Sequence, residues 1–242
     1  MQMKQALMEQ IESGSWKPGE RIPGDVELCK LFGVSRTVVR QALKDMAYEG
    51  LVMREKGRGT FVAEPKISSK SLVHSLAGFY EDMVEHGLEP VADVLEQAMI
   101  PATAKIADRL DIEVMTPVIK LVRLRYVQEE PIVLVTSYLP YDICRALVNA
   151  DLTHQSLYAF LETKCGLQVA SGYRKIDAVV ANEYEAKLLR IEVGAPLLRL
   201  DSVSYLKDGS PLEYFHGLFR SDRAYFEVEI DRIREARGES SV

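Results

Sequence analysis

Cysteine, histidine and tryptophan are scarce in this chain: its 242 residues include three, four and one of them. Cys29, Cys144 and Cys165 are far apart and form no Cys-x-x-Cys pair. We therefore expect three reduced thiols, without a disulfide framework or a zinc knuckle. The chain also has no HExxH motif, phosphate loop or nucleophile elbow, which argues against an enzyme. We expect no metal and no cofactor.

Long apolar runs are missing as well. None approaches the ~18 residues that a membrane-spanning helix needs. The opening stretch MQMKQALMEQIESG lacks the apolar centre of a signal peptide. Internal repeats and low-complexity tracts are also absent. We therefore expect a cytoplasmic protein without a membrane partner, of ordinary globular composition, since 47% of its residues are hydrophobic and 27% are charged.

Charge is distributed unevenly along the chain, although the net charge of −6 gives no overall sign of a nucleic-acid partner. Residues 1–66 carry 11 basic and 9 acidic side chains, whereas the remainder carries 19 basic and 27 acidic ones. The polar stretch EPKISSK, at 64–70, separates the two parts. We predict one domain over 1–63, a linker over 64–70 and a second domain over 71–242.

The first 63 residues predict three helices and a hairpin. Helical patterns cover 3–14, 24–32 and 35–49, and the last of these begins at Ser35, a good N-cap, and ends before Gly50. Two short strands around a Gly-Arg-Gly turn follow. This order of elements is that of a winged helix–turn–helix.

The third helix predicts a DNA-reading face. Arginine can bond guanine in a bidentate fork and glutamine can bond adenine, while threonine can contact phosphate. A slim basic hairpin suits a minor groove or phosphates, because glycine allows close backbone approach. A solvated helix face is the alternative for the two arginines, and it is preferred for Lys44. The candidate DNA-binding residues are Arg36, Thr37, Arg40, Gln41, Lys56, Gly57, Arg58 and Gly59.

The second part predicts an α+β domain on a mainly antiparallel sheet. The turn KDGS lies between the last two strands, which should therefore pair antiparallel. Strands are expected at 91–99, 117–127, 132–139, 168–180, 196–206 and 211–220. Helices are expected at 72–87, 103–110, 140–149, 155–165 and 182–191.

Two strands carry charged residues on otherwise apolar faces. Alternation places Arg123 and Arg125 on the same face as Ile119 and Leu121. Either that face opens to water at one end, or the arginines line a pocket for an anion. Alternation also places Glu213 beside aromatic residues, which suits a sugar ring and equally a salt bridge to Arg123 or Arg125.

The N-terminal part resembles the DNA-binding domain of GntR-superfamily transcription regulators. The resemblance rests on KPGERIPGDVELCKLFGVSRTVVRQALKDMAYEGLVMREKGRGTFV and covers about residues 3–63. It implies that Arg36, Arg40 and the wing residues 56–59 contact DNA.

The remainder resembles the UTRA effector domain of the HutC-like branch of these regulators, whose fold is similar to that of chorismate lyase. The resemblance spans about 71–232 and rests on RLRY, EEPIVLVTSYLP, SLYAFLE, LLRIEVGAPLLRLDSVSY and GSPLEYFHGLFRSDRAYFEVEI. It implies an effector site for a small anionic metabolite, such as a sugar phosphate or amino-sugar phosphate. The implied effector-binding residues are Arg123, Arg125, Ser156, Tyr158 and Glu213.

Together these features favour an effector-responsive transcription regulator, a repressor that binds a pseudo-palindromic operator as a homodimer and responds allosterically. The alternative is an enzyme on the chorismate-lyase-like fold, which substrate turnover would reveal. A constitutive architectural DNA binder is a third class, and the large second domain argues against it.

Overall fold

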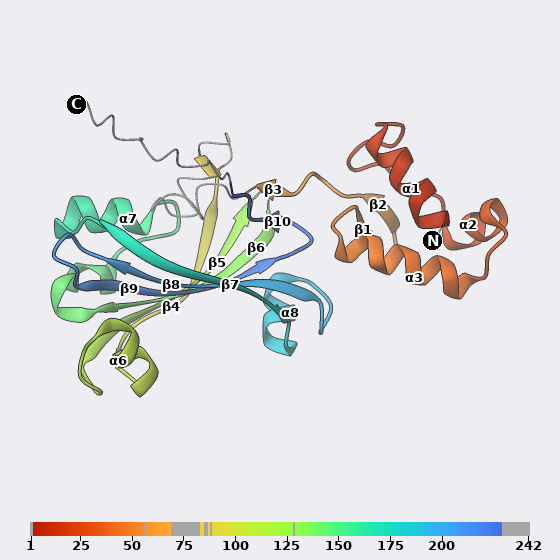
Figure 1. Ribbon diagram of the computed structural model, residues 1–242. Helices are drawn as coiled ribbons and strands as arrows, with labels where there is room; N and C mark the ends of the chain where they lie inside the picture. The colour runs from red at the N-terminus through yellow and green to blue at the C-terminus, as the bar shows by residue number, and fades with distance from the viewer. Residues whose placement is uncertain are drawn as a thin grey trace, which may run out of the picture.

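The structure is a computed structural model that describes residues 2–55, 57–68, 83–84, 87, 89–127 and 129–228. A helical unit with a hairpin opens the chain, and an antiparallel six-stranded sheet flanked by short helices follows (Figure 1). The expected α+β class and winged helix–turn–helix are therefore confirmed. The helix expected over 72–87 lies almost wholly outside the described residues.

Local signals account for the N-terminal unit. The hydroxyl oxygen of Ser35 accepts the backbone N–H of Val38 at 3.4 Å, and Gly50 has a φ of 72° just after the third helix. Val39, Leu43 and Met46 are buried in the core of this unit, as their spacing predicts. The elements are α1 (Gln2–Glu12), α2 (Asp25–Phe32), α3 (Arg36–Tyr48), β1 (Val52–Glu55) and β2 (Gly59–Val62).

The segment before α2 pairs with β2 and so lies beside the hairpin as a third extended segment. The N–H of Gly19 donates to the carbonyl of Val62 at 2.9 Å, and the N–H of Ile22 donates to that of Thr60 at 3.0 Å. These bonds fix the connection between α1 and α2 against the wing.

The sheet has the strand order β4-β5-β6-β9-β8-β7, and every neighbouring pair is antiparallel. A two-stranded parallel pair, β3 with β10, lies outside it. The remaining strands are β3 (Ile67–Ser68), β4 (Val91–Pro101), β5 (Pro117–Val127), β6 (Glu130–Pro140), β7 (Ser171–Val180), β8 (Pro196–Tyr205), β9 (Pro211–Arg220) and β10 (Ala224–Tyr225).

Helices cover both faces of the sheet. On one face, α6 (Ala104–Leu110) and α8 (Glu183–Leu189) pack on separate apolar clusters. On the other face, α7 (Leu157–Phe160) covers a cluster that includes Ile119 and Leu121. A second cluster on this face contains Val133 and Phe219. Figure 1 shows α7 on the opposite side of the sheet from α6 and α8.

Two expected helices differ from the prediction. The stretch expected at 140–149 forms two 3₁₀ turns, η1 (Tyr141–Ile143) and η2 (Arg145–Asn149). The helix is broken at Cys144, whose φ of −149° is not helical, and an ion pair joins Asp142 to Arg145 across the break at 2.6 Å. The stretch expected at 155–165 is α7 followed by the π-helical turn η3 (Leu161–Cys165).

The expectation of three reduced thiols is wrong for two of them. Cys144 and Cys165 are joined by a disulfide, and their Cα atoms are 5.5 Å apart. They are 21 residues apart in the sequence, but η1 and η3 fold onto the same apolar cluster and bring them together. Cys29 is a free thiol.

Candidate functional sites: a nucleic-acid interface and a buried polar face

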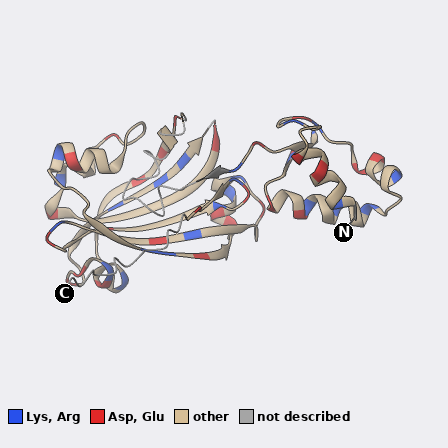
Figure 2. Ribbon diagram, turned by 45° about the horizontal axis from the view of Figure 1, so that its top comes forward, with Lys and Arg blue, Asp and Glu red and all other residues tan. Residues whose placement is uncertain are grey.

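The outer face of α3 carries the predicted reading residues. Arg36, Thr37, Arg40 and Gln41 are all exposed, on the side of the helix away from its buried residues. Figure 2 shows basic and acidic residues interleaved along the N-terminal helices, rather than a surface of one sign. Because these side chains are exposed, they can enter a groove of DNA. Neighbouring carboxylates reduce the net positive charge of this surface.

Two of these side chains are bonded to carboxylates of the same unit. The Nε of Arg40 donates to Asp25 at 3.2 Å, and the amide of Gln41 donates to Asp45 at 2.8 Å. The side chain of Arg40 is 67% exposed, so this ion pair is of the surface kind, which contributes ~0.2–1 kcal/mol. A base edge can replace such a partner at little cost.

The wing depends on its glycines. Gly57 and Gly59 have φ values of 79° and 130°, which other residues rarely adopt. Arg58 forms an ion pair with Glu55, and its guanidinium lies 5.7 Å from the centre of the Phe61 ring. Lys56, the fourth predicted wing residue, lies outside the described residues.

Sequence reasoning missed Arg21. A Cβ built on Gly59 would lie 2.8 Å from the Nε of Arg21, so the exposed Arg21 guanidinium lies directly beside the wing. The pairing of residues 19–22 with β2 brings it there. No signal in the sequence links positions so far apart, because this pairing is a tertiary contact.

The second site lies on the α7 side of the large sheet. Arg123 and Arg125 point to this face of β5 and are only 2% and 5% exposed. The face therefore does not open to water at these two side chains. Register places Arg123 directly opposite Val135, and Val135 directly opposite Gly217 on the next strand, so the three residues form one row on this face.

Glu213 lies on the same face, 1% exposed, and accepts a hydrogen bond from Tyr158 at 2.7 Å. The Tyr158 hydroxyl also lies 3.2 Å from that of Ser204. Burial raises the pKa of the Tyr158 phenol, and the nearby Glu213 charge raises it further. The phenol therefore remains a hydrogen-bond donor at neutral pH.

Ser156 is buried at the start of α7. Its hydroxyl oxygen accepts the backbone N–H of Ala159 at 3.2 Å and so caps the helix. Its own O–H can still donate to an acceptor, since a hydroxyl both accepts and donates. The capping bond also fixes the start of the helix that carries Tyr158.

Two buried serines on this face were missed by sequence reasoning. The hydroxyls of Ser137 and Ser202 have no hydrogen-bond partner among the described residues. Both lie in register with Phe215, and Arg174 of the edge strand β7 lies in register with Ser202. The period-2 spacing of Ser202 and Ser204 is a signal that could have indicated a polar face.

The missing side chain of Gly217 leaves room on this face for two aromatic rings. A Cβ at this position would lie 2.7 Å from the Phe215 ring and 3.0 Å from the Phe219 ring. Both rings can therefore lie over the glycine. The result is a face with two cations, a carboxylate and several hydroxyls next to aromatic surface, a combination that can bind a small polar anion.

Two family models match this chain, one in each of its parts. A model described as "Bacterial regulatory proteins, gntR family" matches residues 1–62, and one described as "UTRA domain" matches residues 85–225. The chain is 31% identical over 232 residues to the HTH-type transcriptional repressor NagR of Bacillus subtilis (strain 168), which covers 96% of this chain and 94% of that protein.

Two further relatives agree. The chain is 32% identical over 197 residues to the histidine utilization repressor of Pseudomonas aeruginosa, covering 81% of this chain and 77% of that protein. The crystal structure of PhnF from Mycobacterium smegmatis superposes with a TM-score of 0.67 at 27% identity, covering 95% of this chain and 99% of that one.

These findings define a DNA-binding transcription regulator rather than an enzyme. The chain belongs to the gntR family of bacterial regulatory proteins and carries a UTRA domain, which confirms the resemblance seen in the sequence. In the part of the chain that the structure describes, no helix is long and apolar enough to cross a membrane. No group of three potential metal ligands occurs among those residues either.

Proposed function

We propose that this protein is an effector-responsive repressor that acts in the cytoplasm, as a homodimer, on a pseudo-palindromic operator. The observation that carries the proposal is the burial of Arg123, Arg125 and Glu213 on one sheet face, in a chain whose α3 exposes Arg36 and Arg40. Charged groups are costly to bury, so such a set is typical of a ligand site.

The side chains favour an anionic, hydroxyl-rich effector. Guanidinium groups suit a phosphate or carboxylate, while Tyr158, Glu213 and Ser204 offer donors and acceptors for hydroxyl or ammonium groups. The names of relatives refer to fructoselysine and to histidine, which are different chemical classes. The composition of the face, rather than family membership, therefore supports a sugar phosphate or amino-sugar phosphate.

A thermal-shift screen tests this proposal. Sugar phosphates, amino-sugar phosphates and amino-acid catabolites would be added to the purified protein. A ligand at 100 times its Kd should add ~2.7 kcal/mol of apparent stability. A hit should also change the affinity of the protein for DNA fragments that it selects from a random library. If the protein selects DNA from the library but no anion of the screen stabilises it, only the proposed effector class is contradicted. If it selects no DNA, the whole proposal is contradicted.

The edge strand β7 supports the homodimer. Among the described residues no strand pairs with its outer edge, and Tyr173, Ile176 and Val180 are 60%, 40% and 70% exposed. A ten-residue edge with exposed apolar side chains is suited to contact with a second copy. We propose that dimer contacts include this strand.

Ile176→Lys is therefore expected to shift the protein from dimer to monomer, because a buried ammonium at the dimer contact would be costly. Sedimentation velocity measures the change. Leu31→Lys, which also replaces an exposed apolar residue (68% exposed, in α2), should leave the dimer intact. A dimer of undiminished affinity in the Ile176 variant would remove β7 from the contact.

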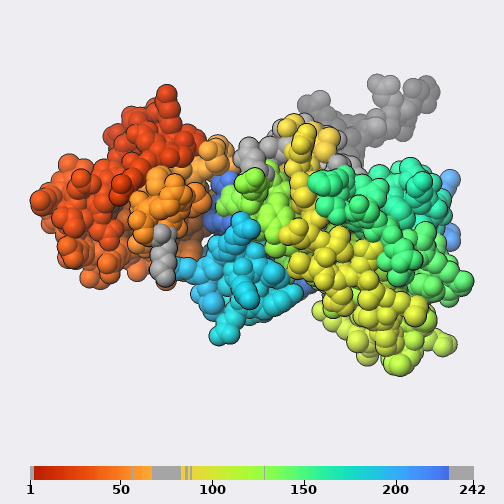
Figure 3. Space-filling model, turned by 180° about the vertical axis from the view of Figure 1, so that it is seen from behind, coloured from red at the N-terminus to blue at the C-terminus, as the bar shows by residue number. Residues whose placement is uncertain are grey.

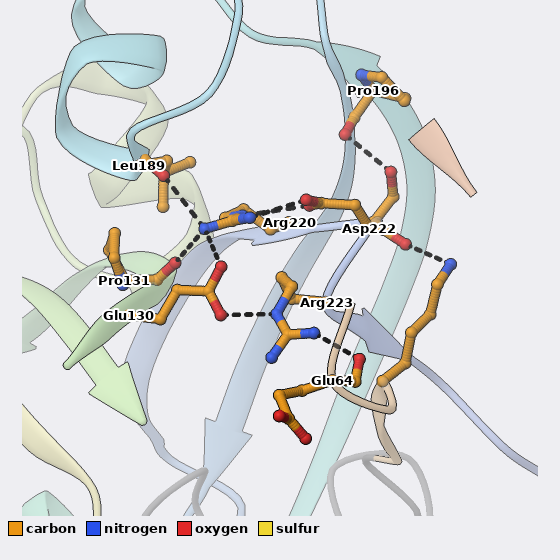
Figure 4. Close-up of polar contacts among 10 residues, drawn as sticks. Glu64, Glu130, Pro131, Leu189, Pro196, Arg220, Asp222 and Arg223 are labelled. Atoms are coloured by element: carbon orange, nitrogen blue, oxygen red, sulfur yellow. Dashed lines mark hydrogen bonds and ion pairs between the residues drawn. The ribbon is translucent and has the colours of Figure 1, made fainter. Parts of the chain in front are cut away.

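A polar network supports a route from the effector face to the DNA-binding unit (Figure 4). Arg220 ends β9, the strand of Glu213, and its guanidinium bonds Asp222 at 2.7 Å and Glu130 at 2.9 Å. Arg223 bonds the same Glu130 at 2.7 Å and donates to the carbonyl of Glu64 at 2.6 Å. The ends of β6 and β9 are thus tied to the segment after the wing.

The two parts of the chain touch at this network. The ammonium of Lys66 donates to the carbonyl of Ser221 at 2.7 Å, and a Cβ on Gly50 would lie 1.9 Å from the carbonyl oxygen of Asp222. Figure 3 shows the N-terminal part meeting the rest of the molecule beside dark blue atoms of the C-terminal segment. We propose that effector binding alters DNA affinity through this contact. A neighbouring cleft is lined by Lys44, Tyr48 and Met53 on one side and by Arg190, Glu192 and Pro196 on the other.

Gly50→Ala is expected to abolish the effector response. Its methyl group has no room beside Asp222, so the contact must open. Gly14→Ala is the matched control, because Gly14 has a φ of 73° against 72° and nothing within 4 Å of an added Cβ. Both variants should be less stable by ~1–2 kcal/mol, because a residue with a Cβ is disfavoured in the left-handed backbone conformation. DNA-binding titrations with and without effector compare them, and equal responses would exclude the contact from coupling.

A further inference from the structure

Two cysteines enclose the helix that carries two of the proposed effector-binding residues. The disulfide between Cys144 and Cys165 closes a ring that contains Ser156 and Tyr158. Cys165 is the last residue of η3, which continues α7 without a break, and Cys144 lies between η1 and η2. The bond therefore ties the far end of the Tyr158 helix to the segment that leaves β6.

The surroundings of the two sulfurs differ. Cys144 is 3% exposed and packs in the apolar cluster with Leu147 and Leu161, whereas Cys165 is half-buried. Leu157, Phe160 and Leu161 of the same helical segment belong to that cluster. The helix thus has apolar packing to hold it when the bond is open, and an oxidant reaches the pair through Cys165.

A permanent disulfide between Cys144 and Cys165 is not expected in the cytoplasm. This inference rests on the proposed function, because a protein that acts on chromosomal DNA works in the cytoplasm, where thiols are kept reduced. Disulfides in that compartment are as a rule transient and often redox-sensing. The third cysteine, Cys29, is a free thiol in α2 and packs against the core of the N-terminal unit, not against the cluster of Cys144.

We propose that Cys144 and Cys165 form a reversible redox site that takes a hydroperoxide as oxidant and a cellular dithiol as reductant. The Cys165 thiolate attacks the peroxide, which gives a sulfenic acid and, from hydrogen peroxide, water after proton transfer. The Cys144 thiol then attacks the sulfenic sulfur and displaces a second water. Overall, two thiols and one hydrogen peroxide give one disulfide and two waters. A dithiol reverses the step by exchange and becomes a disulfide itself.

The bond is expected to act on the effector face through the helix. In the oxidised protein, the end of the helix is fixed and Tyr158 is held against Glu213, 2.7 Å away. In the reduced protein, packing, the Ser156 cap and the Tyr158 hydrogen bonds still hold the start of the helix. Its far end is no longer tied, so the amides there should exchange with solvent more readily. Oxidation thus pre-organises the face, and pre-organisation favours tighter binding.

The first experiment counts thiols in the full-length protein. Samples are treated with a phosphine reductant or with hydrogen peroxide, alkylated with iodoacetamide and weighed by mass spectrometry. Three alkylated cysteines are expected after reduction, and after oxidation only the free Cys29 should react. Cys144→Ser and Cys165→Ser should lose the intramolecular bond, whereas Cys29→Ser should keep it. Three reactive thiols after peroxide treatment, or a bond that survives excess phosphine, would overturn the proposal.

The second experiment measures the effect on the helix. Amide exchange over 157–165 should be severalfold slower in the oxidised wild type than in the reduced wild type or in the Cys144→Ser protein. Equal exchange in all three would overturn the link to the effector face. Neither readout uses DNA or a ligand, so failure of the proposed repressor function remains a separate result.

Discussion

Arg40→Ala is expected to weaken operator binding by ~1–3 kcal/mol while leaving the fold intact. Arg40 is exposed on α3, and its only strong contact among the described residues is the surface ion pair with Asp25 at 3.2 Å. Its removal therefore takes no packing from the core of Val39, Leu43 and Met46. Fluorescence anisotropy with a selected DNA fragment measures the loss, and circular dichroism checks the fold.

Lys30→Ala is the matched control for Arg40→Ala, because Lys30 is an exposed cation on the neighbouring helix α2. It should change affinity only slightly and without regard to DNA sequence, as expected for a remote charge. The Arg40 variant should in addition relax the sequence preference at one base position of each half-site. Wild-type affinity and preference in a folded Arg40 variant would contradict a reading role for this residue.

Arg123→Ala is expected to abolish the response to the effector and to leave DNA binding in place. The guanidinium is 2% exposed and lies on the sheet face of Glu213, so it can meet an anion away from water. Hydrogen bonds to charged groups contribute ~1.5–3 kcal/mol, so their loss should lower the affinity of the protein for the anion by roughly one to two orders of magnitude. Calorimetry with the sugar phosphate that stabilises the wild type gives the change directly.

Two further variants separate binding from folding. Arg123→Lys keeps the charge but loses the planar fork, so partial rescue of affinity is expected if Arg123 binds an anion. Arg199→Ala removes an arginine from the opposite face, where it bonds Asp177 at 2.8 Å, and should leave the response intact. Unaltered effector affinity in a folded Arg123→Ala protein would remove this residue from the site.

The sequence by itself determined the helical unit and the faces of single strands. Ser35 and Gly50 mark the ends of α3 because caps act within a few residues, and helical spacing identified its buried side. Alternation likewise placed Arg123 and Arg125 together on one face of β5, since the period of a strand is local. The gntR and UTRA resemblance rested on such local motifs and was confirmed for both parts.

Only the tertiary structure decided which strands and loops are neighbours. The order β6-β9-β8 places Ser137 and Ser202 on either side of Phe215, and neither pairing has a signal within its own strand. The same holds for Arg21 beside the wing and for the disulfide between Cys144 and Cys165. These contacts join residues far apart in the chain. They are fixed by the packing of whole elements, which caps, periodicity and turn residues do not encode.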